Sequence, residues 1–75
     1  MSLIIGARVS YVDDPSDTGR IIRTKFSRRA PHWLPDTPAL SAPVMWYLVE
    51  WDTPTGAEVW WRARYLVAAE VEVQK

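Results

Sequence analysis

The feature of the chain best suited to binding a ligand is a run of cations with no acid among them. It consists of Arg20, Arg23, Lys25, Arg28 and Arg29. His32 and Trp33 follow it closely, and cations beside an aromatic ring suit contact with the phosphates and bases of nucleic acid. The alternative is a solvated strand edge, where Arg and Lys discourage edge-to-edge aggregation. We predict nucleic-acid contact, because five cations exceed what edge protection needs.

Aromatic residues form the second candidate site. The chain has five Trp, three Tyr and one Phe among 75 residues. Trp46, Leu48 and Trp61 fall in two neighbouring predicted strands, and we predict that they form an apolar partner-binding surface together with Trp33. Either a second copy of the chain covers this surface, or the chain's own Trp33 and Leu34 close over it. We favour self-association, since a proline-rich segment is stiff and extended.

The same rings permit a different chemistry, an aromatic cage for a cation. Tyr11, Trp46, Trp51 and Trp60 would supply the rings, with Glu50 or Asp52 as the acid. Packing in the core is the more common use of such residues in a small domain. We therefore rank the cage below the core.

No catalytic constellation is visible in the sequence. His32 lies alone between Pro31 and Trp33, the three glycines are isolated, and Asp13 and Asp14 precede Pro15-Ser16 as turn formers do. We expect no enzymatic activity, no metal site and no cofactor.

The overall composition sets limits on the class of protein. With 48% hydrophobic and 24% charged residues, the chain is typical of one folded domain spanning 1–75. A formal net charge of zero argues against general polyanion binding. Cysteine is absent and the N-terminal apolar run is short, so we expect no disulfide, no signal peptide, no membrane span and a cytoplasmic location.

Short β-branched and aromatic runs separated by turn residues predict an all-β fold. We expect strands at 7–12, 20–26, 44–51 and 57–62, one helical or 3-10 turn at 63–66 and a closing strand at 67–73. A turn is expected at 13–19, and a proline-rich insertion at 27–43 holds four of the six prolines. Four or five short antiparallel strands would curl into a small barrel.

The period of two along a strand sorts the side chains into faces. Tyr47, Val49 and Trp51 share one face of their strand, while Trp46, Leu48 and Glu50 share the other. The predicted core consists of Val9, Ile21, Tyr47, Val49, Trp51 and Leu66.

Four sequence features together resemble a known family. They are Gly6-x-Arg8-Val9, Asp14-Pro15-Ser16-x-x-Gly19-x-Ile21, Tyr47-Leu48-Val49-Glu50-Trp51-Asp52, and Glu58-Val59-Trp60 with Leu66 six residues on. This pattern resembles the bacterial SH3-like barrels related to Tudor and KOW modules, which occur at the front of helicase-like ATPases and contact nucleic acid or protein. The long insertion and the doubled Trp60-Trp61 depart from that pattern.

A small plasmid-borne dihydrofolate reductase also has an SH3-like fold, but its site depends on a Val-Gln-Ile-Tyr segment. The equivalent stretch here, Glu58-Val59-Trp60-Trp61, has neither the Gln nor the Tyr. The resemblance therefore implies a binding or adaptor module for nucleic acid or a nucleic-acid-handling protein. The alternative is a protein-only interaction domain that uses the aromatic face and the proline-rich loop.

Overall fold

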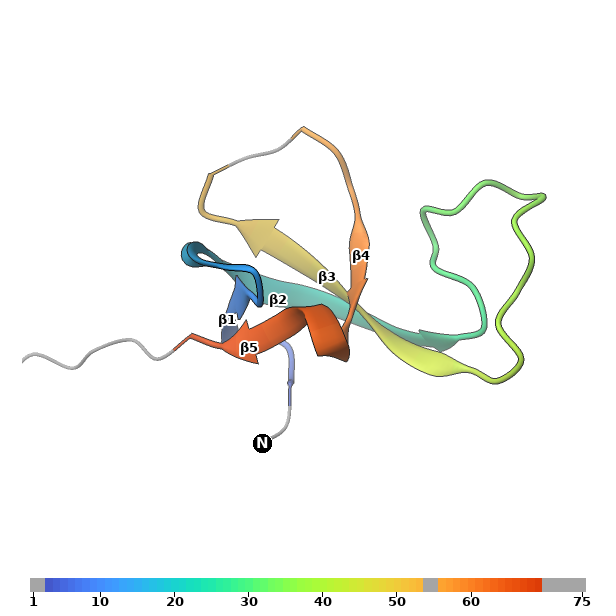
Figure 1. The fold of residues 1–75 in the computed structure, drawn as a ribbon, viewed down its shortest axis with the longest axis horizontal. Coiled ribbons are helices and arrows are strands. Elements are labelled where there is room, and N and C mark those ends of the chain that lie inside the picture. Colours follow the sequence, from blue (N-terminus) through green and yellow to red (C-terminus); the bar gives the residue numbers. More distant parts are fainter. Residues whose placement is uncertain (1–2, 54–55, 70–75) are drawn as a thin grey trace, which may run out of the picture.

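The computed structural model describes residues 3–53 and 56–69, and its regular structure consists of β-strands and one 3-10 turn (Figure 1). The strands are β1 (Arg8–Tyr11), β2 (Asp14–Ser27), β3 (Val44–Trp51), β4 (Trp60–Arg62) and β5 (Leu66–Ala68), with one 3-10 turn, η1 (Ala63–Tyr65), before the last strand. They form a single antiparallel sheet in the order β4-β3-β2-β1-β5. The all-β prediction is confirmed, and so are the number of strands and the 3-10 turn. None of the helices in the described residues is long and apolar enough to cross a membrane.

The first hairpin is tighter than the sequence indicated. We expected a turn over 13–19, but Tyr11 already pairs with Asp14, and β2 begins there. The Asp14 carboxylate accepts hydrogen bonds from the Ser16 backbone N–H at 3.2 Å and from the Ser16 hydroxyl at 2.6 Å. This Asx-type bonding accommodates the turn residues within an irregular stretch of the strand, so turn chemistry and strand pairing coexist.

Gly19 allows β2 to approach β3 closely. A Cβ atom at this position would lie 2.7 Å from both the Glu50 carbonyl oxygen and a methyl of Val49. Real side chains do not tolerate such contacts, so only glycine fits without moving β3.

The end of the sheet also differs from expectation. The predicted strand at 57–62 is shortened to β4, and the predicted closing strand begins one residue earlier, at Leu66. Residues 70–73 of that predicted strand lie outside the described part of the chain. The predicted turn at 63–66 is present as η1.

One face of the sheet carries the predicted core. Val9, Ile21, Val49 and Leu66 are buried together, and Tyr47, Trp51 and Trp61 pack against them. We call this cluster the strand core. It confirms the assignment of Tyr47, Val49 and Trp51 to a single face of β3.

The opposite face of β3 has its own buried cluster, which we call the loop core. It consists of Ala30, Trp46, Leu48 and Trp60, with Trp33, Leu40 and Val44 packed against it. Ala30, Trp33 and Leu40 come from the proline-rich loop between β2 and β3, which lies at the far end of the long β2–β3 ribbon in Figure 1. The loop of the same chain therefore covers the second face of the sheet.

Candidate nucleic-acid interface

Two contacts join the proline-rich loop to the sheet, and a third, within the sheet, links Trp46 to the end of β2. The rings of Trp33 and Trp46 pack edge to face with their centroids 5.2 Å apart. The indole N–H of Trp46 donates to the Ser27 carbonyl at 3.0 Å, and the backbone N–H of Trp60 donates to Nδ1 of His32 at 3.1 Å. His32 thus acts as an acceptor that joins the loop to β4.

Two members of the predicted basic run also hold this loop. Arg28 Nε donates to the Leu40 carbonyl at 2.8 Å, and a terminal nitrogen of Arg29 donates to the Leu34 carbonyl. Arg29 is half-buried, and its Nε has no partner among the described atoms. The structure therefore gives these two predicted nucleic-acid contacts a role in shaping the loop.

The other three cations are exposed on β2, but their surroundings differ. Arg20 lies opposite Glu50 on β3, and its charge is among those that lower the pKa of Asp52. Arg23 pairs with Leu48 and Lys25 with Trp46, so both belong to the face that carries the loop core. Neither the Arg23 side chain nor the Lys25 side chain has a hydrogen bond or ion pair within the described residues.

Arg23 and Lys25 border a concavity of about 470 Å³, which we call the cationic concavity. Pro31 of the loop, Glu58 and Trp60 also line it. Two unpaired cations beside an aromatic ring are suited to binding an anionic ligand. The carboxylate of Glu58, the one acid in the lining, would repel such a ligand.

A second concavity, of about 520 Å³, is lined mainly by rings, and we call it the aromatic concavity. Its rings are those of Tyr11, Trp33, Trp46, Trp60, Trp61 and Tyr65, with His32, Leu40, Val59 and Arg62 completing the wall. No carboxylate is present among these lining residues. Trp60 borders both concavities, so the two lie side by side.

The predicted partner-binding surface is not assembled as expected. Trp46 and Leu48 are only 4% and 6% exposed, because the loop covers them, and Trp33 lies half-buried against Trp46. Leu34, which we expected to help cover them, is 70% exposed. Of the two predicted alternatives, the one in which the chain's own loop covers Trp46 and Leu48 agrees with the structure. The covering residue is Trp33, and Leu34 takes no part.

Trp61 lies on the opposite face of the sheet from Trp46 and Leu48. It pairs with Tyr47, whereas Trp60 pairs with Leu48. The Trp61 ring packs at centroid distances of 5.2 Å from Tyr11 and 6.0 Å from Trp51. Trp61 therefore does not share the strand face of Trp46 and Leu48, where alternation along β4 places Trp60 instead, but it lines the same aromatic concavity as Trp33 and Trp46.

The cation cage is not supported by the geometry. Tyr11, Trp46 and Trp60 do line one concavity, but Trp51 and Glu50 do not. The charged side chain in the wall is Arg62, whose positive charge would repel a cation. The position of Arg62 could have been predicted from the sequence, because Arg62 is two residues after Trp60 in one strand and so shares its face.

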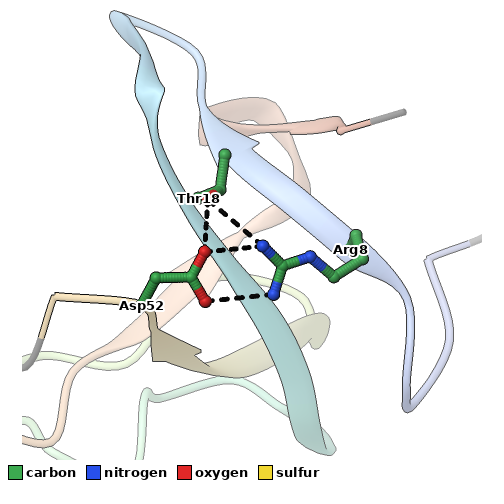
Figure 2. Close-up of polar contacts among 3 residues, drawn as sticks. All are labelled: Arg8, Thr18 and Asp52. Atoms are coloured by element: carbon green, nitrogen blue, oxygen red, sulfur yellow. Dashed lines mark hydrogen bonds and ion pairs between the residues drawn. The ribbon is translucent and has the colours of Figure 1, made fainter. Parts of the chain in front are cut away.

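Asp52, the other acid considered for the cage, is bound in a cluster of its own (Figure 2). Arg8 donates to the two carboxylate oxygens of Asp52 at 3.0 and 2.6 Å, and the Thr18 hydroxyl donates to Asp52 at 2.5 Å. The hydrogen bond from Arg8 is the main reason that the pKa of Asp52 falls to about 2, and the bond from Thr18 adds to it. This cluster joins β1, β2 and the residue after β3, and the sequence analysis did not detect it.

Asp13 and Asp14 lie in the first hairpin, and Asp14 is engaged with Ser16. Among residues 3–53 and 56–69, no group of three His, Asp or Glu side chains is placed to hold a metal ion.

Comparison of the chain with protein-family models, with curated proteins and with solved structures finds no match. We therefore infer a function from the geometry of the two concavities.

Proposed function

We propose that this chain is an SH3-like barrel that works as a non-catalytic nucleic-acid-binding module. The observation that carries the proposal is the cationic concavity, in which Arg23 and Lys25 are exposed without partners beside the Trp60 ring. A polyanion gains most from cations that have no competing carboxylate contact. A cytoplasmic location, expected from the absence of cysteine, is part of this proposal.

The order of the strands supports a barrel of this kind. The two outer strands of the sheet, β4 and β5, are consecutive in the chain and separated only by η1. A short connection brings such edges together, and closure of the sheet would remove exposed strand edges. The motifs that resemble SH3-like barrels fall on β1, β2, β3 and β4.

Single-stranded nucleic acid is the form that the site suits best. Its bases are free to stack on aromatic rings while its phosphates meet the cations, whereas the bases of a duplex are already stacked. Rings and cations are neighbours here, because Trp60 borders both concavities.

The test is fluorescence anisotropy of a labelled ten-nucleotide single-stranded DNA, titrated with protein at several salt concentrations. Arg23→Ala and Lys25→Ala should each weaken binding and reduce the slope of log K against log salt by about 0.7. Glu58→Gln should strengthen binding, because it removes the one carboxylate of the cationic concavity. Arg64→Ala is the matched control, since Arg64 is an exposed cation on η1 that borders neither concavity.

Absence of binding by the unmodified protein at low salt would overturn the proposal. An equal effect of Arg64→Ala and Arg23→Ala would also contradict it, since the interaction would then depend on total charge and not on this site.

A protein-only interaction is the second candidate, and one surface favours it. Phe26 and Met45 pair across β2 and β3 and are 65% and 38% exposed. Because Thr24 pairs with Tyr47 next to them, they lie on the face opposite the loop. Analytical ultracentrifugation of the unmodified protein and of Phe26→Ser tests this: an oligomer that Phe26→Ser dissociates would support a self-contact.

A further inference from the structure

We infer that the aromatic concavity is a pocket for one nucleobase and that Arg62 contacts the phosphate attached to it. The inference rests on the proposed function and adds to it a second subsite with a defined ligand. It concerns residues on β1, β4, η1 and the loop that the cationic concavity does not include, apart from Trp60.

The shape and lining of the concavity suit a flat aromatic group. A volume of about 520 Å³ is within the range of small-ligand sites. Tyr65 is 40% exposed, and Tyr11, Trp33 and Trp61 are half-buried, so each of these rings still presents surface to a ligand. Trp46 and Trp60 are buried and form fixed parts of the wall.

The charge of the concavity selects among aromatic ligands. Arg62 is the charged side chain of the wall, and no Asp or Glu is among the lining residues. A cationic ligand would meet repulsion without compensation, whereas a phosphate would form charge-assisted hydrogen bonds with the guanidinium group. The ligand is therefore an aromatic ring that carries a negative charge.

Hydrogen-bonding capacity favours a heterocycle over a hydrocarbon ring. The indole N–H groups of Trp60 and Trp61 are buried without a partner in the described structure, and both rings line the concavity. Both N–H groups are shielded from the surface, so a ligand would reach them only after a shift of the rings; a nucleobase then has ring nitrogens and carbonyl oxygens to accept from them, whereas an aliphatic or phenyl group has no acceptor.

The position of Arg62 connects this pocket to the cationic concavity. Lys25 pairs with Trp46 across β2 and β3, and Trp46 pairs with Arg62 across β3 and β4. Lys25 and Arg62 therefore occupy one row across the sheet, on the same face, with Trp46 between them. A single strand whose base enters the aromatic concavity can extend its backbone from Arg62 towards Lys25 around Trp60.

The experiment compares small ligands that share parts of a nucleotide. Adenosine 5′-monophosphate, ribose 5-phosphate and inorganic phosphate are titrated into the unmodified protein, and binding is followed by tryptophan fluorescence and by chemical shifts of the indole N–H signals. Adenosine monophosphate should bind at least about tenfold more tightly than ribose 5-phosphate, because stacking of the base is the main contribution. The inference would be overturned if ribose 5-phosphate or inorganic phosphate bound as tightly as adenosine monophosphate.

Two variant pairs test the residues named. Tyr65→Leu should weaken binding of adenosine monophosphate by about tenfold through loss of the ring, while Tyr65→Phe keeps the ring and should bind as the unmodified protein does. Arg62→Ala should reduce the preference for adenosine monophosphate over adenosine, and Arg64→Ala should leave that preference unchanged. Indistinguishable Tyr65→Leu and Tyr65→Phe proteins would refute stacking at this pocket.

The failure of this inference differs from a failure of the proposed function. If the ten-nucleotide DNA binds in a manner that depends on Arg23 and Lys25 but not on Tyr65 or Arg62, the module binds nucleic acid and this pocket is not its base site. If neither the ten-nucleotide DNA nor adenosine monophosphate binds the unmodified protein at low salt, both proposals are wrong.

Discussion

The strand core and the loop core lie on opposite faces of β3 and are closed in different ways. In the strand core, β-branched and leucine side chains of four strands meet directly. In the loop core, two Trp and a Leu of the sheet are covered by a long loop through Ala30, Trp33 and Leu40. The first cluster depends on pairing between strands, while the second depends on a segment with no regular structure of its own.

This difference explains why both concavities lie beside the loop. A loop without ladder bonding needs other partners for its carbonyl groups, and it finds them in the Arg28 and Arg29 side chains, while His32 accepts from the backbone of β4. The edges of such a cover leave concavities, and both candidate subsites lie beside the loop. The cationic concavity borders the loop core alone, whereas the aromatic concavity also takes Trp61 from the strand core.

Removal of the loop should have the largest effect. Ser27 and Val44 pair at the ends of β2 and β3, so a short Gly-Ser turn can replace residues 28–43 and keep the hairpin. The strand core should survive, while exposure of Trp46, Leu48 and Trp60 should cause self-association. Sedimentation and circular dichroism measure the two results, and a soluble monomer would show that the loop is not needed to cover this face.

Ile21→Ala addresses the strand core directly. Ile21 is fully buried, so the change removes apolar contacts and leaves a cavity, and we expect a loss of about 3 kcal/mol in the free energy of unfolding. Chemical denaturation gives the value. Ile22→Ala is the control, since Ile22 is exposed and should change stability by less than about 1 kcal/mol.

Gly19→Ala tests how closely β2 and β3 approach. The added methyl would meet the Glu50 backbone and Val49 at 2.7 Å, and overpacking of this kind costs about 1–3 kcal/mol. Thermal unfolding should show the loss, with the loop core still intact by fluorescence. A variant as stable as the unmodified protein would mean that the strands can separate locally without penalty.

Loss of the Arg8–Thr18–Asp52 cluster should have the smallest effect on stability, because the Asp52 side chain is 53% exposed. Its folded-state pKa of about 2 lies below the usual 3.8, so the contribution is present above pH 3.8 and is lost as pH falls towards 2. The difference in melting temperature between the unmodified protein and Asp52→Asn should be constant above about pH 5 and should shrink between pH 4 and 2. Asp13→Asn, at an exposed residue with no hydrogen bond in the described structure, should show no such change.

The pattern of apolar residues was enough to predict the strand core and the fold class. Alternation along β3 separated Tyr47, Val49 and Trp51 from Trp46 and Leu48, because successive side chains of a strand point to opposite faces. What covers the second face became clear only from the folded chain, in which the proline-rich loop lies over it. A proline-rich segment has no hydrophobic periodicity from which its position could be predicted. Local sequence signals therefore do not distinguish a loop that packs on its own sheet from one that extends to a second copy of the chain.

The same limit applies to the charged residues. The sequence identified five cations as one run, but the fold divided them, with Arg28 and Arg29 bonded to loop carbonyls and Arg23 and Lys25 left exposed. It also brought Arg8 to Asp52, which is 44 residues away in the chain, and Arg62 to a wall of rings. Such pairings depend on strand register and on where a loop folds back, and these are properties of the assembled sheet.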